Sequence, residues 1–159
     1  PNVFVQMDTY AVKGLQSGQI QFLYAPTHLN PTYEYGVTFE RGTAVTYGDR
    51  KQIFISGTAS IDNQGEIMYP GDILKQTERM LENIDTLLQE AGGGLQDIMQ
   101  AIVYLRDPAD YVVVKQYIES RYPSFLHLIV HAPVCRPGWL IETECIAVVP
   151  ADEPQYACL

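Results

Sequence analysis

Basic side chains are scarce in this sequence. Its 159 residues include ten Lys and Arg against nineteen Asp and Glu, so the formal net charge is −9. Arg50 and Lys51 are the only two basic residues that are adjacent. Proteins that bind nucleic acids depend on Lys and Arg to neutralise phosphates. We therefore expect no nucleic-acid partner.

Cysteines and long apolar runs are also few. The three cysteines are too few, and odd in number, for a disulfide framework. They favour a reducing, cytoplasmic setting. No apolar run approaches the roughly 20 residues that span a bilayer, and the first ten residues do not resemble a signal peptide. We expect no membrane partner and one globular domain.

Residues 1–35 contain several helix and strand breakers. Gly14, Gly18, Pro26 and Pro31 interrupt the apolar stretches, which predicts an irregular segment with one or two short strands. The sequence does not begin with Met. We expect residues 1–35 to be a connecting segment, the tail of a missing N-terminal region, and residues 36–159 to form the domain.

Beyond residue 36 the pattern becomes regular. Residues 42–47 and 51–56 are typical of strands. Asp72 is a good N-cap for a helix with an apolar residue at every third or fourth position, which the glycines at 92–94 end.

The second half predicts more strands and one more helix. Residues 98–105 are apolar at nearly every position, as in a central strand covered on both faces. Asp107 and Pro108 favour the start of a helix that runs to about Tyr122. Two further strands are expected at 126–134 and 140–149.

These elements predict an α+β fold with one mixed, mostly antiparallel sheet and two helices on one face. The strands carry apolar side chains for both faces, and the chain has no third helix to cover the second. Another copy of the chain is the expected cover, so we predict a homo-oligomer.

Several motifs occur in the order found in one known family. Ser56-Gly57, Gln76-Thr77, Asn83 and Glu142-Thr143-Glu144 lie along residues 39–150. Together they resemble the YjgF/RidA superfamily. The resemblance implies a chorismate mutase-like fold, a homotrimer, and a cleft between subunits that binds a small carboxylate metabolite.

Two departures qualify this resemblance. The deaminases of the family hold the substrate carboxylate with an Arg in a Pro-Ala-Arg segment, where this chain has Pro123-Ser124-Phe125. The segment from Cys135 to Glu142 is about two residues longer than in the deaminases and resembles the chorismatases, which hydrolyse chorismate. Residues 39–42 and 56–61 are also similar to that branch. The resemblance therefore implies a chorismatase-like hydrolase or lyase acting on an enol-ether acid.

The expected catalytic residues are Glu142 and Cys135. Glu142 lies in an apolar strand, where burial raises the pKa of a carboxyl and makes it a general acid. Cys135 is expected to shape the pocket beside it. The expected substrate-binding residues are two candidate carboxylate clamps, two positions whose backbone N–H groups can hold an anion, and two aromatic residues: Arg41, Arg136, Gly57, Thr58, Phe39 and Phe125.

Two other functions stay open. One is an enamine or imine deaminase whose carboxylate recognition has moved to Arg136. The other is a metabolite-binding domain without catalysis. We expect no cofactor. We also expect no metal, because His127 and His131 lie four residues apart on a strand, or roughly 13 Å, too far to share one ion.

Overall fold

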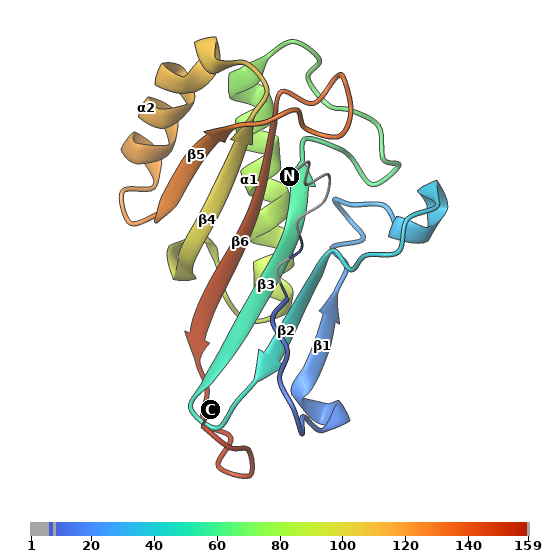
Figure 1. The fold of residues 1–159 in the computed structure, drawn as a ribbon, viewed down its shortest axis with the longest axis vertical. Coiled ribbons are helices and arrows are strands. Elements are labelled where there is room, and N and C mark those ends of the chain that lie inside the picture. Colours follow the sequence, from blue (N-terminus) through green and yellow to red (C-terminus); the bar gives the residue numbers. More distant parts are fainter. Residues whose placement is uncertain (1–6, 8, 159) are drawn as a thin grey trace, which may run out of the picture.

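The structure, a computed structural model, describes residue 7 and residues 9–158. Residues 1–6 of the expected connecting segment lie outside the described residues. The described chain forms a six-stranded sheet in the order β1-β2-β3-β6-β4-β5 (Figure 1). Neighbouring strands are antiparallel, except that β4 and β5 are parallel. The strands are β1 (Ile20–Leu23), β2 (Gly42–Thr46), β3 (Arg50–Ala59), β4 (Ile98–Leu105), β5 (His127–His131) and β6 (Ile141–Pro150).

Two α-helices connect these strands, α1 (Ile73–Glu90) and α2 (Tyr111–Arg121). Asp72 caps α1 by accepting the backbone N–H of Lys75 at 3.0 Å. Asp107 accepts the N–H of Ala109, but it caps a short 3₁₀ turn, Pro108–Asp110, that precedes α2. The mixed sheet and the two helices confirm the predicted α+β fold.

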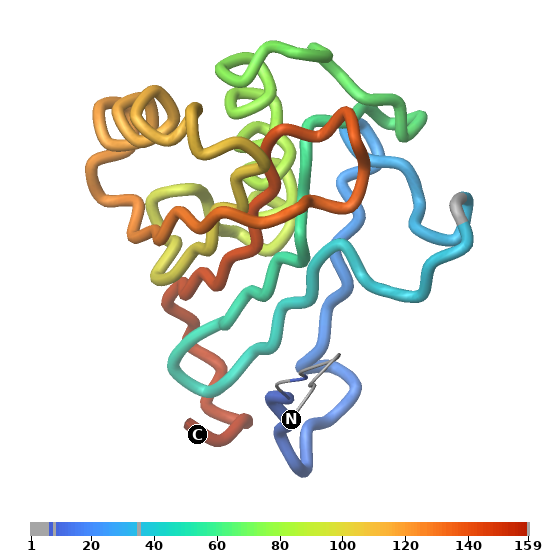
Figure 2. Tube along the Cα trace, turned by 45° about the horizontal axis from the view of Figure 1, so that its top comes forward, coloured from blue at the N-terminus to red at the C-terminus, as the bar shows by residue number. Residues whose placement is uncertain are grey.

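Both helices lie on the same side of the sheet. Helix α1 packs against β3 and β6, with α2 beside it, as Figures 1 and 2 show. The apolar stripe predicted for α1 forms the centre of this layer. Its fully buried members are Met80, Leu81, Ile84, Leu87 and Leu88.

The other face of the sheet is more open. On β6, the side chains of Glu142, Glu144, Ile146 and Val148 alternate with buried ones and point away from the helices. At the edge strand β5, Leu128 is 62% exposed. This open face is the one for which the sequence predicts a second copy of the chain, and that cover stays a prediction.

The segment before residue 36 contributes to this sheet. Strand β1 pairs with β2, and Leu23, Ala25 and Leu29 are buried in the core. The division of the chain at residue 36 stays a prediction, and residues 20–29 pack as part of the same unit. Among the described residues, no helix combines the length and apolar character needed to cross a membrane.

Candidate functional site

Glu142 lies where the open face meets the loop between β5 and β6. The antiparallel register places it beside Ala59 of β3 and opposite Tyr104 of β4. Here the side chains surround a cavity of about 340 Å³. Its walls come from three strands and the loop, and they comprise Gly57, Tyr104, Ala132, Pro133, Val134, Cys135, Glu142 and Glu144.

The environment of Glu142 favours its protonated form. Burial of the side chain raises the pKa of this carboxyl, since the charged form loses hydration. The backbone N–H of Cys135 lowers the pKa, while the negative charge of nearby Glu144 raises it. The net direction is upward, so Glu142 holds its proton to a higher pH than an ordinary glutamate does.

Gly57 allows the Glu142 carboxyl to take this position. The β3–β6 ladder has an irregularity between Ile55 and Thr58, so Gly57 lies in a bulge. A Cβ atom built on Gly57 would overlap Oε1 of Glu142. The absence of a side chain at this position is therefore a requirement of the site.

Tyr104 and Glu144 form a second polar pair in the same cavity. The hydroxyl of Tyr104 donates to Oε1 of Glu144 at 3.0 Å. Burial, followed by the hydrogen bond to Glu144, raises the pKa of Tyr104 to about 12. Tyr104 is thus a neutral hydrogen-bond donor that orients the Glu144 carboxylate.

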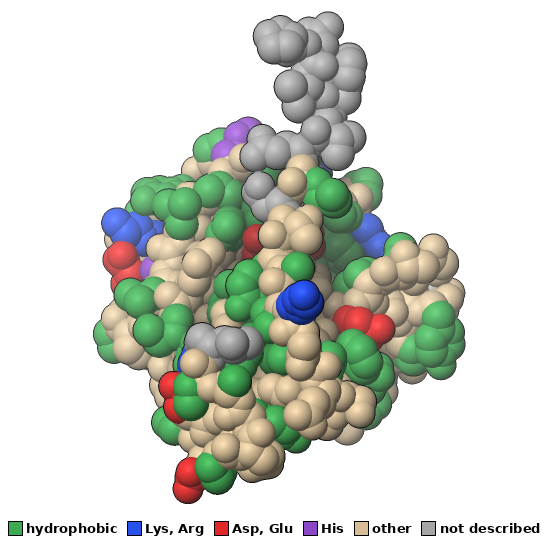
Figure 3. Space-filling view, turned by 60° about the horizontal axis from the view of Figure 1, so that its bottom comes forward, with side chains coloured by type: hydrophobic (Ala, Val, Ile, Leu, Met, Phe, Trp, Pro, Cys, Tyr) green, Lys and Arg blue, Asp and Glu red, His purple; other side chains and the backbone are tan. Residues whose placement is uncertain are grey.

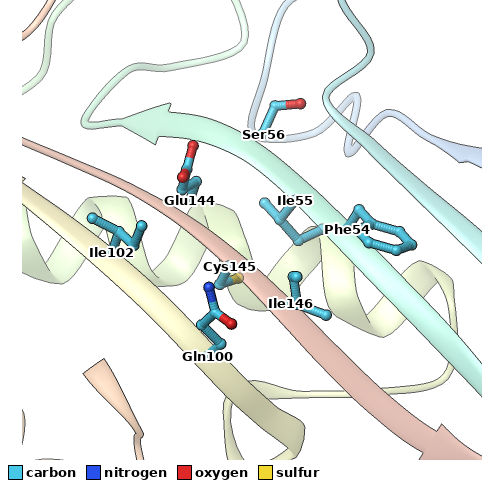
Figure 4. A pocket seen from close by; sticks show the side chains of 8 residues that line it. All are labelled: Phe54, Ile55, Ser56, Gln100, Ile102, Glu144, Cys145 and Ile146. Carbon is cyan, nitrogen blue, oxygen red and sulfur yellow. The ribbon is translucent and has the colours of Figure 1, made fainter. Parts of the chain in front are cut away.

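Glu144 also borders an apolar hollow on the open face. This hollow has a volume of about 290 Å³, and Phe54, Ile102 and Ile146 supply its apolar walls (Figure 4). Glu144 lines both this hollow and the Glu142 cavity.

The structure brings only some of the sequence-predicted residues to this cavity. Cys135 lines it with an exposed thiol, and Gly57 contacts Glu142. Thr58 is buried beside them, but its hydroxyl donates to the carbonyl of Ser56 at 2.9 Å. Phe125 is 4% exposed and packs in the hydrophobic core, away from the cavity lining.

Arg41 borders a different cavity. Its guanidinium is buried, donates to the backbone and side-chain oxygens of Asn30 at 3.0 and 2.9 Å, and lies 5.4 Å from the ring centre of Phe39. The cavity beside it has a volume of about 420 Å³ and is bounded mainly by residues 24–33.

Arg136 is closer in sequence to the Glu142 cavity. It follows Cys135 in the same loop, and its guanidinium lies 5.2 Å from the ring centre of Trp139. It is not among the residues that line the cavity.

Tyr104 and Glu144 were not predicted from the sequence. Glu144 has the same parity as Glu142 on β6, which places the two carboxylates on one face. Tyr104 becomes part of the site only through the register of β4 against β6. The alternation along β6 was a usable signal for Glu144, but no pattern within the sequence gives the register.

The family follows from a comparison with known proteins. Residues 42–149 match the model of a family described as endoribonuclease L-PSP. This match covers more than half of the chain, and the chain belongs to this family, the YjgF/RidA group that its motifs resemble.

Two relatives are about one third identical to the chain over stretches of nearly 100 residues. The 3-aminoacrylate deaminase RutC of Acinetobacter baylyi is 31% identical over 99 residues, which are 61% of this chain and 79% of the relative. A RutC family protein of Pyrococcus abyssi is 35% identical over 97 residues, which are 60% of this chain and 76% of the relative.

Solved structures show the same fold at lower identity. Escherichia coli TdcF with bound serine is 21% identical, with a TM-score of 0.66 over 81% of this chain and 98% of TdcF. RidA from an Antarctic Psychrobacter species is 23% identical, with a TM-score of 0.66 over 81% of this chain and 99% of that one. The likeness to the chorismatase branch stays a prediction.

Proposed function

We propose that this protein hydrolyses a small enamine or imine acid in the Glu142 cavity, releasing ammonia. The observation that carries the proposal is the Glu142 carboxyl, whose pKa is raised by burial at the wall of a cavity large enough for a small metabolite. The 3-aminoacrylate deaminase among the relatives supports the substrate class.

The proposed reaction needs an acid more than a nucleophile. Glu142 gives its proton to the electron-rich carbon of the enamine, which leaves an iminium group. Water then adds to the iminium carbon and returns a proton to the Glu142 carboxylate. Collapse of this adduct expels ammonia and leaves a carbonyl. A half-buried acid with a raised pKa suits the first step, because it holds its proton to a higher pH than an ordinary glutamate.

A direct assay tests this reaction. An enamine acid is generated in situ in the presence of semicarbazide, which traps the imine that forms from it. The protein is expected to speed ammonia release and to suppress the trapped product. Equal trapping with and without the protein would contradict the deaminase function.

A second candidate function is hydrolysis of an enol ether, as in chorismatases. It is favoured by the Cys135 thiol in the cavity wall and by Phe125, which is buried where the deaminases have Arg. The same acid step applies, because protonation of an enol-ether carbon creates an electrophile for water. Incubation with chorismate decides it, through loss of its ultraviolet absorbance and appearance of pyruvate. If neither substrate reacts but a small carboxylate raises the melting temperature, the protein is a binding domain.

The endoribonuclease name of the family is not the function that we propose. On the face seen in Figure 3, the Lys and Arg side chains of the described residues stand apart from one another. The net charge of −9 also opposes the binding of a polyanion.

In this proposal the substrate carboxylate is bound by Arg136, which follows the cavity-lining Cys135 in the same loop and would reach the ligand from outside the cavity wall. Removing a charge-assisted contact should weaken ligand binding by about 2–3 kcal/mol in Arg136→Ala. Arg41→Ala should have a smaller effect, because Asn30 binds its guanidinium in a separate cavity. The ligand for this test is the small carboxylate that raises the melting temperature the most. Calorimetry with it measures the binding free energy of both variants. Arg121→Ala, on the exposed end of α2, is the control. Normal binding in both Arg136→Ala and Arg41→Ala would show that another residue binds the substrate carboxylate.

We also propose that the open sheet face is covered by other copies of the chain in a homotrimer. Phe54, Ile102 and Ile146 line an apolar hollow on that face, and burial of such a surface stabilises an assembly. Light scattering at micromolar concentration should give three times the mass of the chain. A monomer under these conditions would contradict the proposal.

A further inference from the structure

Arg106 lies under the loop that carries Cys135. It follows the last residue of β4, and its guanidinium donates to three carbonyls of the loop. Nε donates to the carbonyl of Trp139 at 2.6 Å, and Nη2 donates to those of Val134 and Arg136 at 2.7 and 2.6 Å. A single side chain therefore fixes the backbone on both sides of Cys135.

Gln76 of α1 holds the far end of the same loop. Its side chain is fully buried, donates to the carbonyl of Gly138 at 3.0 Å, and accepts the N–H of Leu140 at 2.9 Å. Connecting loops are usually the mobile parts of a fold. Here two side chains from separate elements determine the path of the loop between β5 and β6.

The geometry of one peptide group links Arg106 to Glu142. The carbonyl of Val134 and the N–H of Cys135 belong to the same planar trans peptide, so they point in opposite directions. Arg106 binds the carbonyl end, and the N–H end is the backbone group that lowers the pKa of the Glu142 carboxyl. The orientation of this N–H group is thus set from the opposite side of the loop.

We propose that Arg106 is a positioning residue for the acid, acting through the Val134–Cys135 peptide, which lies beside Glu142 in the wall of the same cavity. This inference rests on the proposed function for the role of Glu142, but the geometric link is independent of the substrate. The other titratable groups facing Glu142 are Glu144 on the same strand, Tyr104 on β4 and the Cys135 thiol; β3 presents Gly57.

The experiment follows the ionisation of Glu142 in the full chain. Isotope-labelled glutamate carboxyl carbons are observed by NMR across a pH series, and Glu142→Gln identifies the resonance. In Arg106→Met the Cys135 N–H is released from its fixed orientation. Since that N–H lowers the pKa of Glu142, the titration should move to higher pH than in the wild type. Arg106→Lys, which keeps a charged donor, should recover part of the wild-type behaviour.

Arg79 provides a matched control. It is also largely buried and donates to backbone carbonyls, those of Ile61 and His28, but it does so away from the cavity. Arg79→Met should lower the melting temperature and leave the Glu142 titration unchanged. Gln76→Ala, which removes the hydrogen bonds at the other end of the loop, serves as the second test variant if Arg106→Met does not fold, and it should shift the titration in the same direction.

Turnover gives a separate readout. A displacement of about 1 Å in a reacting group can cost about a hundredfold in rate, so kcat in Arg106→Met should fall roughly tenfold or more, with KM changed less. The positioning role would be overturned by an unshifted Glu142 titration in Arg106→Met, or in Gln76→Ala if Arg106→Met does not fold. An equal shift in the control Arg79→Met would also overturn it. If neither an enamine nor chorismate reacts, the proposed function fails while the titration still decides the role of Arg106.

Discussion

Glu142→Gln should lose turnover by roughly a hundredfold or more while it still binds ligand. Glutamine matches the shape of glutamate but cannot supply a proton, and removal of a general acid costs about this much. Steady-state rates of the variant and the wild type measure the loss. Calorimetry with a small carboxylate separates lost chemistry from lost binding.

The pH dependence of the wild type follows from the same carboxyl. The acid acts only while protonated, so turnover should be retained below the raised pKa of Glu142 and fall as the pH rises through it. The stability of the fold should depend on pH in the same direction as turnover. The folded state binds this proton more tightly than the unfolded state, so its stabilising contribution is lost as the pH rises through the folded pKa. Glu142→Gln should therefore gain stability relative to the wild type at alkaline pH.

Cys135→Ala is the comparison for Glu142→Gln. It removes the thiol from the cavity wall and keeps the backbone N–H, so it should lose less activity and alter specificity instead. A covalent substrate adduct on Cys135, seen by mass spectrometry, would reverse the two roles. Full activity in Glu142→Gln would show that the reaction takes place elsewhere.

Gly57→Ala should abolish most of the activity with little effect on the fold. The added Cβ overlaps the end of the Glu142 side chain. Because that end is flexible, the carboxyl moves aside and the backbone is spared. Displacement of a reacting group by about 1 Å can lower the rate about a hundredfold, and we expect turnover to fall by that order. Turnover and melting temperature of the same preparation measure the two effects.

Ser56→Ala is the matched control for Gly57→Ala. Ser56 is the preceding residue in the same bulge, and its hydroxyl donates to the carbonyl of Glu40 at 2.6 Å. Its replacement adds no atom beside Glu142, so turnover should stay near that of the wild type. The alternative is that Gly57 matters for folding alone. In that case the melting temperature of Gly57→Ala would fall sharply, and activity would be lost only in proportion to the unfolded fraction.

Local sequence patterns were sufficient to predict the fold. The spacing of apolar residues in α1 and the cap at Asp72 define that helix, and the apolar run of β4 defines that strand without a shift at either end. Such signals are local, since a helix repeats every 3.6 residues and a strand every two. The 3₁₀ turn before α2 escaped prediction, because Asp107 and Pro108 begin either kind of helix.

The site depends on contacts that local patterns do not contain. Glu142 was predicted because a carboxyl within an apolar strand is unusual. The role of Arg106 was not, since its partners lie between Val134 and Trp139, far along the chain. Phe125 was expected at the substrate from its place in a motif, but the structure buries it in the core. Which side of the loop faces the core is decided by packing between elements that are distant in sequence.

The ionisation of Glu142 in the wild type tests the central claim most directly. NMR of isotope-labelled glutamate carboxyl carbons, assigned with Glu142→Gln, follows this one group through a pH series without any assumption about the substrate. We expect Glu142 to keep its proton to a higher pH than free glutamate, because burial and the charge of Glu144 outweigh the N–H of Cys135. A titration at or below the pH of free glutamate would contradict it, since the surroundings of the carboxyl would then not favour the protonated form that the proposed acid step requires.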